Sequence, residues 1–159
     1  MALCAAAALG FLSGCASSYQ PAKAVPLVAP GPKNYGIWFT ADCRLSAARA
    51  DLTLSTDGRL SHDTLRFVVT SGPALAAPPE IVVWGVGGFD LNIEGRDRTF
   101  SFELPYGPRE VADMMNDKVF LVFSYKPAGA DRALKAVFPA RELPEAITEL
   151  ANGCLPPKK

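Results

Sequence analysis

The sequence has a single histidine, His62, in 159 residues, and this scarcity removes several classes of catalytic site. A serine hydrolase needs a base beside its nucleophile, and no Gly-x-Ser-x-Gly elbow accompanies the histidine. Since there are also no two cysteines at ligand spacing, the residues predict no metal and no cofactor. We interpret His62 as a surface residue in a polar turn.

The chain also lacks net charge, because sixteen basic and sixteen acidic residues cancel. All of them lie beyond the first fourteen residues, and they form no basic cluster. Affinity for nucleic acid comes mainly from neutralised phosphates, so a nucleic-acid partner is not expected. The terminal Lys158-Lys159 is interpreted as part of a solvated tail.

Residues 1–14 are apolar or small and carry no charge. This run is shorter than the roughly 20 residues of a membrane-spanning helix, and it fits the apolar core of an export signal. The alternative is a buried, alanine-rich helix. Because no basic residues precede the apolar run, either the natural start lies upstream of Met1 or the export signal is weak.

At the end of this run, Leu12-Ser13-Gly14-Cys15 resembles the lipobox of bacterial lipoproteins. The resemblance implies that a diacylglyceryl group is attached to the Cys15 thiol and that residues 1–14 are removed. Membrane lipid is then the partner of Cys15. The next residue, Ala16, favours the outer membrane facing the periplasm by similarity to enterobacterial sorting.

The segment that follows, 15–33, is rich in proline, alanine and serine and has neither helical nor strand periodicity. Such a segment buries too little apolar surface to offset the entropy of ordering it, so we expect an extended tether. Residues 34–155 have the length of one domain, and 156–159 form a tail.

The cysteine count becomes simple if the lipobox is used. Cys4 then leaves with the signal peptide and Cys15 carries lipid, so Cys43 and Cys154 remain. Two cysteines in an oxidising compartment predict one disulfide bond. The alternative is a pair of buried free thiols.

The pattern of the domain predicts an α+β fold, a mostly antiparallel β-sheet or sandwich with a C-terminal helix packed on it. Residues 45–50 are predicted to be a loop or a helical turn, and 81–84 a buried strand. The turn of the clearest hairpin is placed at 95–98. The predicted strands are 36–43, 51–56, 64–70, 81–84, 89–94, 99–104, 118–125 and 133–138.

Two helices are expected. Val111, Met114 and Met115 have helical spacing within 109–117. The last helix begins near Pro144, which suits a first turn, and Gly153 is predicted to form its C-terminal cap.

The end of the chain, with Val137-Phe138 and then Ile147 and Leu150 before Cys154, resembles small exported proteins of the invasion-associated locus B type. That family implies a β-sandwich that ends in a short helix beside a disulfide. No functional residue is transferred from the resemblance.

Two functions are compatible with these features. The first is a non-catalytic binding or envelope-assembly role for a lipid-anchored domain. Its contact surface would include Trp84 and Tyr106, although core packing is the better expectation for Trp84. The alternative is a cell-envelope hydrolase or glycan-active enzyme that uses the carboxylates Asp90, Glu94 or Glu103.

Two other patterns have simpler explanations. Gly85-Val86-Gly87-Gly88 lacks the third glycine and the following helix of a phosphate-binding loop, and it is interpreted as a bend or bulge. Asp113 and Asp117 are one helical turn apart, which fits a solvated helix face.

Overall fold

A computed structural model describes residues 31–85 and 91–157. The predictions for the signal peptide, for Cys15 and its tether up to residue 30, for Asp90 and for Lys158-Lys159 fall outside the described residues. The first strand begins at Lys33, one residue before the predicted start of the domain. The described core and the disulfide both lie within residues 35–155, so this part of the chain contains its own hydrophobic core.

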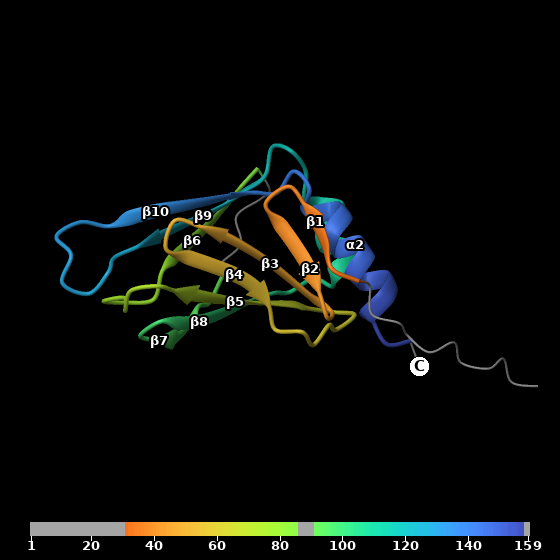
Figure 1. Cartoon of the computed structure of the whole chain (residues 1–159), viewed down its shortest axis with the longest axis horizontal. Helices are drawn as coiled ribbons and strands as arrows, with labels where there is room; N and C mark the ends of the chain where they lie inside the picture. Colours follow the sequence, from red (N-terminus) through yellow and green to blue (C-terminus); the bar gives the residue numbers. More distant parts are fainter. Residues whose placement is uncertain (1–30, 86–90, 158–159) are drawn as a thin grey trace, which may run out of the picture.

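The described chain forms two antiparallel sheets, with two helices side by side at one end (Figure 1). The larger sheet has the order β1-β2-β3-β4-β5-β8-β7, and the smaller one has the order β10-β9-β6. This confirms the predicted α+β fold. The elements are β1 (Lys33–Tyr35), β2 (Trp38–Ala41), β3 (Arg44–Arg49), β4 (Leu52–Thr56), β5 (Leu65–Ser71), β6 (Glu80–Trp84), β7 (Glu94–Arg96), β8 (Thr99–Leu104), α1 (Pro108–Met114), β9 (Phe120–Tyr125), β10 (Leu134–Pro139) and α2 (Leu143–Cys154).

Alternation of apolar and polar residues places the core face of the larger sheet. In β5, Leu65, Phe67 and Val69 are buried, and they lie opposite Leu104, Phe102 and Phe100 of β8. β4 pairs with the other edge of β5. Period-two patterning puts one set of side chains on one face, and here that face packs against the smaller sheet.

Aromatic side chains connect the two sheets through the core. Phe102 of the larger sheet lies 6.1 Å from Phe123 of the smaller one, measured between ring centroids. Phe123 meets Phe138 edge-on at 5.4 Å, and Phe138 lies 6.2 Å from Trp38. Tilted and edge-on pairs at these distances are favourable beyond their buried area, so they fix how the sheets face each other.

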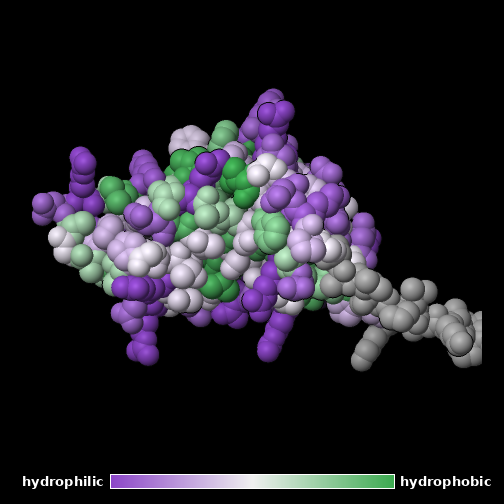
Figure 2. Space-filling model, in the orientation of Figure 1, coloured by the Kyte–Doolittle hydropathy of each residue, from purple (hydrophilic) through white to green (hydrophobic). Residues whose placement is uncertain are grey.

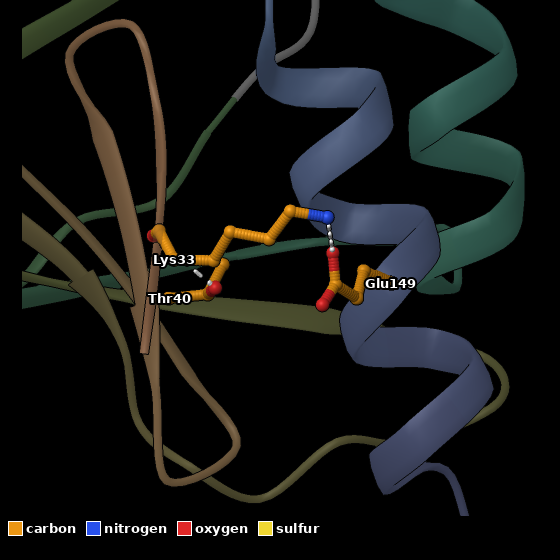
Figure 3. A network of polar contacts seen from close by, with 3 residues as sticks. All are labelled: Lys33, Thr40 and Glu149. Atoms are coloured by element: carbon orange, nitrogen blue, oxygen red, sulfur yellow. Dashed lines mark hydrogen bonds and ion pairs between the residues drawn. The ribbon is translucent and has the colours of Figure 1, made fainter. Parts of the chain in front are cut away.

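The C-terminal helix, α2, has an apolar stripe, with Leu143, Ile147 and Leu150 buried. It contacts α1 and the strands β1, β2 and β3. At its exposed side, the Lys33 ammonium lies 3.0 Å from a Glu149 carboxylate oxygen and ties β1 to α2 (Figure 3). Neither described helix is long and apolar enough to cross a bilayer.

The predictions for residues 36–50 need correction. The expected strand at 36–43 is shorter, because Gly36 (φ 60°) turns the chain between β1 and β2 and Asp42 and Cys43 turn it again. Residues 45–50, predicted as a loop or helical turn, belong mainly to β3. Alanine has low strand propensity, but pairing with β2 and β4 buries Leu45 and Ala47, and burial overrides propensity.

The structure also differs from the predictions for the strands at 81–84 and 89–94. β6 is not buried on both faces but lies at the edge of the smaller sheet. In the next hairpin, strand pairing begins at Glu94 and the turn is at Asp97-Arg98, since Asp97 adopts a φ of 59°. Leu91 to Ile93 are described as irregular chain.

Both helix ends differ slightly from the predictions. Gly153 is not a cap but lies within α2, which ends at Cys154 and is capped by Leu155. α1 ends at Met114, so Asp117 lies beyond it and does not share a helix face with Asp113.

Candidate functional site

A shallow polar depression of about 370 Å³ lies on the outer face of the larger sheet, over β5, β8 and β7. Two of the three carboxylates of the enzymatic hypothesis, Glu94 and Glu103, line it, together with Arg66 and Ser101. Arg66 is directly opposite Glu103, and Glu94 is directly opposite Ser101. The strand register therefore brings together residues from distant parts of the sequence.

Two hydrogen bonds join polar groups of this depression in pairs. Arg66 Nη2 donates to the Ser101 hydroxyl at 2.9 Å, and Asn92 Nδ2 donates to a Glu94 carboxylate oxygen at 3.5 Å. Arg66, Glu94 and Glu103 are exposed. The two carboxylates thus stand on an open sheet face with a guanidinium among them, an arrangement that suits weak binding of a polar ligand. A water-excluding catalytic site needs a more enclosed arrangement.

His62 lies beside a second hollow, of about 350 Å³, between α1 and the end of α2. Its Nε2 donates to the Pro156 carbonyl at 2.7 Å, which ties the chain after α2 to the loop before β5. Arg109 at the same hollow donates to Asn152 Oδ1 at 3.4 Å. The histidine is half-buried, and the bond explains it as a structural residue.

The predicted disulfide joins Cys43, in the turn between β2 and β3, to Cys154, the last residue of α2. The two Cα atoms are 5.6 Å apart, within the usual range for a disulfide. The bond therefore closes the side of the fold where α2 packs on the first strands.

The remaining candidate residues do not assemble into a site. Gly85 follows β6 with a φ of 94°, as a bend requires, while residues 86–88 lie outside the described chain. Within 31–85 and 91–157, no three His, Cys, Asp or Glu residues are grouped so that they could hold a metal ion.

Trp84 is the functional candidate whose environment differs most from expectation. Core packing was expected, yet its side chain is 62% exposed at the end of β6. Pro78-Pro79 before this strand and Gly85 after it are the features of the sequence that could have indicated an edge strand. Tyr106 is half-buried in the loop before α1.

Comparison of the chain with protein-family models, with curated proteins and with solved structures finds no match.

Proposed function

We propose that the chain is a lipid-anchored protein of the bacterial cell envelope, whose β-rich domain has a non-catalytic binding or assembly role. The observation that carries this proposal is Leu12-Ser13-Gly14-Cys15 at the end of an uncharged apolar run. The acyl group on Cys15 would hold the chain at the membrane surface.

The cysteine chemistry supports the same compartment. Cys43 and Cys154 form a disulfide, and such bonds persist mainly in oxidising compartments outside the cytosol. Cys4 would be removed with the signal peptide. Cys15 is then the one cysteine of the mature chain left for acylation.

The tether supports the anchoring as well. Fifteen residues lie between Cys15 and the first described residue, Gly31. A proline-rich chain of this length reaches on the order of 45 Å at about 3 Å per residue. The domain would therefore stay near the bilayer, but the tether alone would not fix its orientation.

The alternative function, an envelope hydrolase or glycan-active enzyme, has less support. Glu94 and Glu103 share one depression, but they are exposed on an open sheet face beside Arg66. A binding role needs no enclosed acid and base, so it fits this geometry better.

Acylation can be tested by growing cells with an alkyne-bearing fatty acid and comparing the chain with its Cys15→Ala variant. We expect the label to be lost in the variant. Cys4→Ala is the matched control, because that cysteine lies in the predicted signal peptide, and it should keep the label. A Cys15→Ala chain that remains labelled would refute the proposal.

A further inference from the structure

The outer face of the smaller sheet is apolar, although it faces solvent. Its outward side chains form two cross-strand rows, which are two register positions apart. The first row is Pro139, Phe120 and Trp84, and the second is Val137, Val122 and Val82. We call these six residues the apolar face.

The apolar face is not needed for the core. The residues that alternate with it, such as Leu121, Phe123 and Val83, point to the other side and are buried. Trp84 is 62% exposed and Val82 50%, while α2 packs on the opposite end of the other sheet. Figure 2 shows hydrophobic side chains exposed among hydrophilic ones on the upper side of the molecule, over β9 and β10.

The size of the apolar face indicates whether a second copy of the chain could cover it in a stable dimer. An aromatic side chain covers about 150–250 Å², so the exposed fractions of the six residues amount to on the order of 400 Å². That is about half of the ~800 Å² per partner in a stable protein interface, yet it matches the largest patches of monomers, which are often functional. The area is therefore too small for a stable dimer through this face.

The segments that contain the three strands of the face have a small net positive charge. Residues 80–85 and 117–141, which include the three strands, contain five basic and three acidic residues, and the remainder of the neutral chain has eleven and thirteen. Lys118 and Arg141 flank one end of the face, where Arg141 Nε lies 3.9 Å from a Glu142 carboxylate oxygen. The next cross-strand row contains Lys135 on β10 and Glu80 on β6, on either side of Ser124. The border is therefore mixed, with a small positive excess over these segments, and an apolar centre beside such an excess is compatible with an anionic lipid surface.

The second row favours lipid over sugar. Sugar rings stack on aromatic residues such as Trp84 and Phe120, but their hydroxyl groups also need hydrogen-bond partners. Val82, Val122 and Val137 offer none, so hydroxyl groups placed on them would lose bonds to water without replacement. Acyl chains and glycerol backbones at a bilayer interface carry no such cost.

We infer that the apolar face docks on the surface of a bilayer that contains anionic phospholipid, with Trp84 and Phe120 inserted at the interface. Tryptophan prefers this depth of the bilayer because its ring is apolar and its N–H is polar. The inference rests on the proposed anchoring only in that anchoring would bring the domain to a membrane. Docking would then fix the orientation of the domain and leave the larger sheet facing away.

Residues 31–159 provide the test, because this fragment contains the whole described fold and lacks the predicted acylation site. Vesicles of phosphatidylglycerol and phosphatidylcholine in equal amounts would be added, and Trp84 fluorescence and co-sedimentation measured. The chain has two tryptophans, and Trp38 is fully buried, so a change in emission reports Trp84. We expect a blue shift, co-sedimentation, and weaker binding in high salt.

Variants make the test specific to the face. Phe120→Ser should weaken vesicle binding by about tenfold or more. Phe39→Ser is the matched control, because Phe39 is 40% exposed on the larger sheet and Phe120 38% on the smaller one. The control should bind like the unaltered fragment, and circular dichroism would verify that both variants are folded.

Several outcomes would overturn the inference. They are no binding to anionic vesicles, equal weakening by the two serine substitutions, or a lipid-free blue shift that grows with protein concentration, which would indicate a second copy as the occupant. A blue shift of Trp84 fluorescence on addition of soluble envelope glycans, and none on addition of vesicles, would indicate a sugar ligand. None of these outcomes depends on Cys15, so acylation and docking can fail separately.

Discussion

At the scale of single residues, Tyr125 shows how burial changes the chemistry of a side chain. It is 2% exposed on β9, and its hydroxyl donates to a carboxylate oxygen of Asp51 at 3.4 Å. Burial, together with the nearby negative charge of Asp51, raises the pKa of Tyr125 above its usual value of 10.0. The folded protein therefore keeps this proton at a pH where the unfolded chain releases it.

The raised pKa predicts a loss of stability in alkali. As pH rises above about 10, the unfolded state loses the Tyr125 proton first, so the free energy of unfolding falls until the pH passes the folded pKa. Tyr125→Phe should remove this part of the pH dependence. Urea unfolding from pH 8 to 11.5 would measure it, and parallel curves for the two proteins above pH 10 would contradict the prediction.

At the scale of elements, the turn between β3 and β4 is held by Ala50 in an unfavourable conformation. Arg49 pairs with Leu52, and Ala50 between them has a φ of 50°. Left-handed backbone costs a residue with a Cβ about 1–2 kcal/mol, whereas glycine adopts it freely. Asp51 in the same turn accepts the Tyr125 hydrogen bond, so the turn also fixes a contact with the smaller sheet.

Ala50→Gly is therefore expected to raise the free energy of unfolding, by about 0.5–1 kcal/mol after the greater entropy of glycine in the unfolded chain is included. Ala48→Gly is the matched control, because Ala48 is exposed in the interior of β3 and should lose about the same amount. Urea titrations of the two variants should shift in opposite directions. Equal destabilisation would show that the turn is not strained.

The elements also show where sequence reasoning succeeds. β4, β5, β8 and β9 were predictable because their alternating or continuous apolar residues are local patterns. β3 was not, since its alanines favour no strand until β2 and β4 pair with it. The edge position of β6 depends on the order of strands in the smaller sheet, which no local pattern encodes.

The candidate surfaces were harder to predict for the same reason. The polar depression joins Arg66 to Glu94 and Glu103 only because β5, β8 and β7 are neighbours in one register. The apolar face likewise needs the pairing of β9 with both β6 and β10. By contrast, the disulfide was predictable without knowledge of the fold, because the lipobox resemblance sets Cys4 and Cys15 aside and leaves one pair.

At the scale of the whole molecule, the disulfide joins the beginning of the fold to its end. Cys43 lies in the second turn and Cys154 ends the last helix, 111 residues later. A bond across so long a loop removes much of the entropy of the unfolded chain, about 4.7 kcal/mol for roughly 100 residues in the chain-entropy model. The small size of the domain makes this a large share of its stability.

Reduction is therefore expected to lower the free energy of unfolding by about 2–5 kcal/mol, the range seen when small secreted domains lose a native disulfide. Urea unfolding of residues 31–159 with and without dithiothreitol would measure the difference. The double variant Cys43→Ala, Cys154→Ala is the control, because it should match the reduced protein and respond to no reductant. Two titratable thiols in the unfolded, non-reduced protein would contradict the bond, and with it the argument for an oxidising compartment.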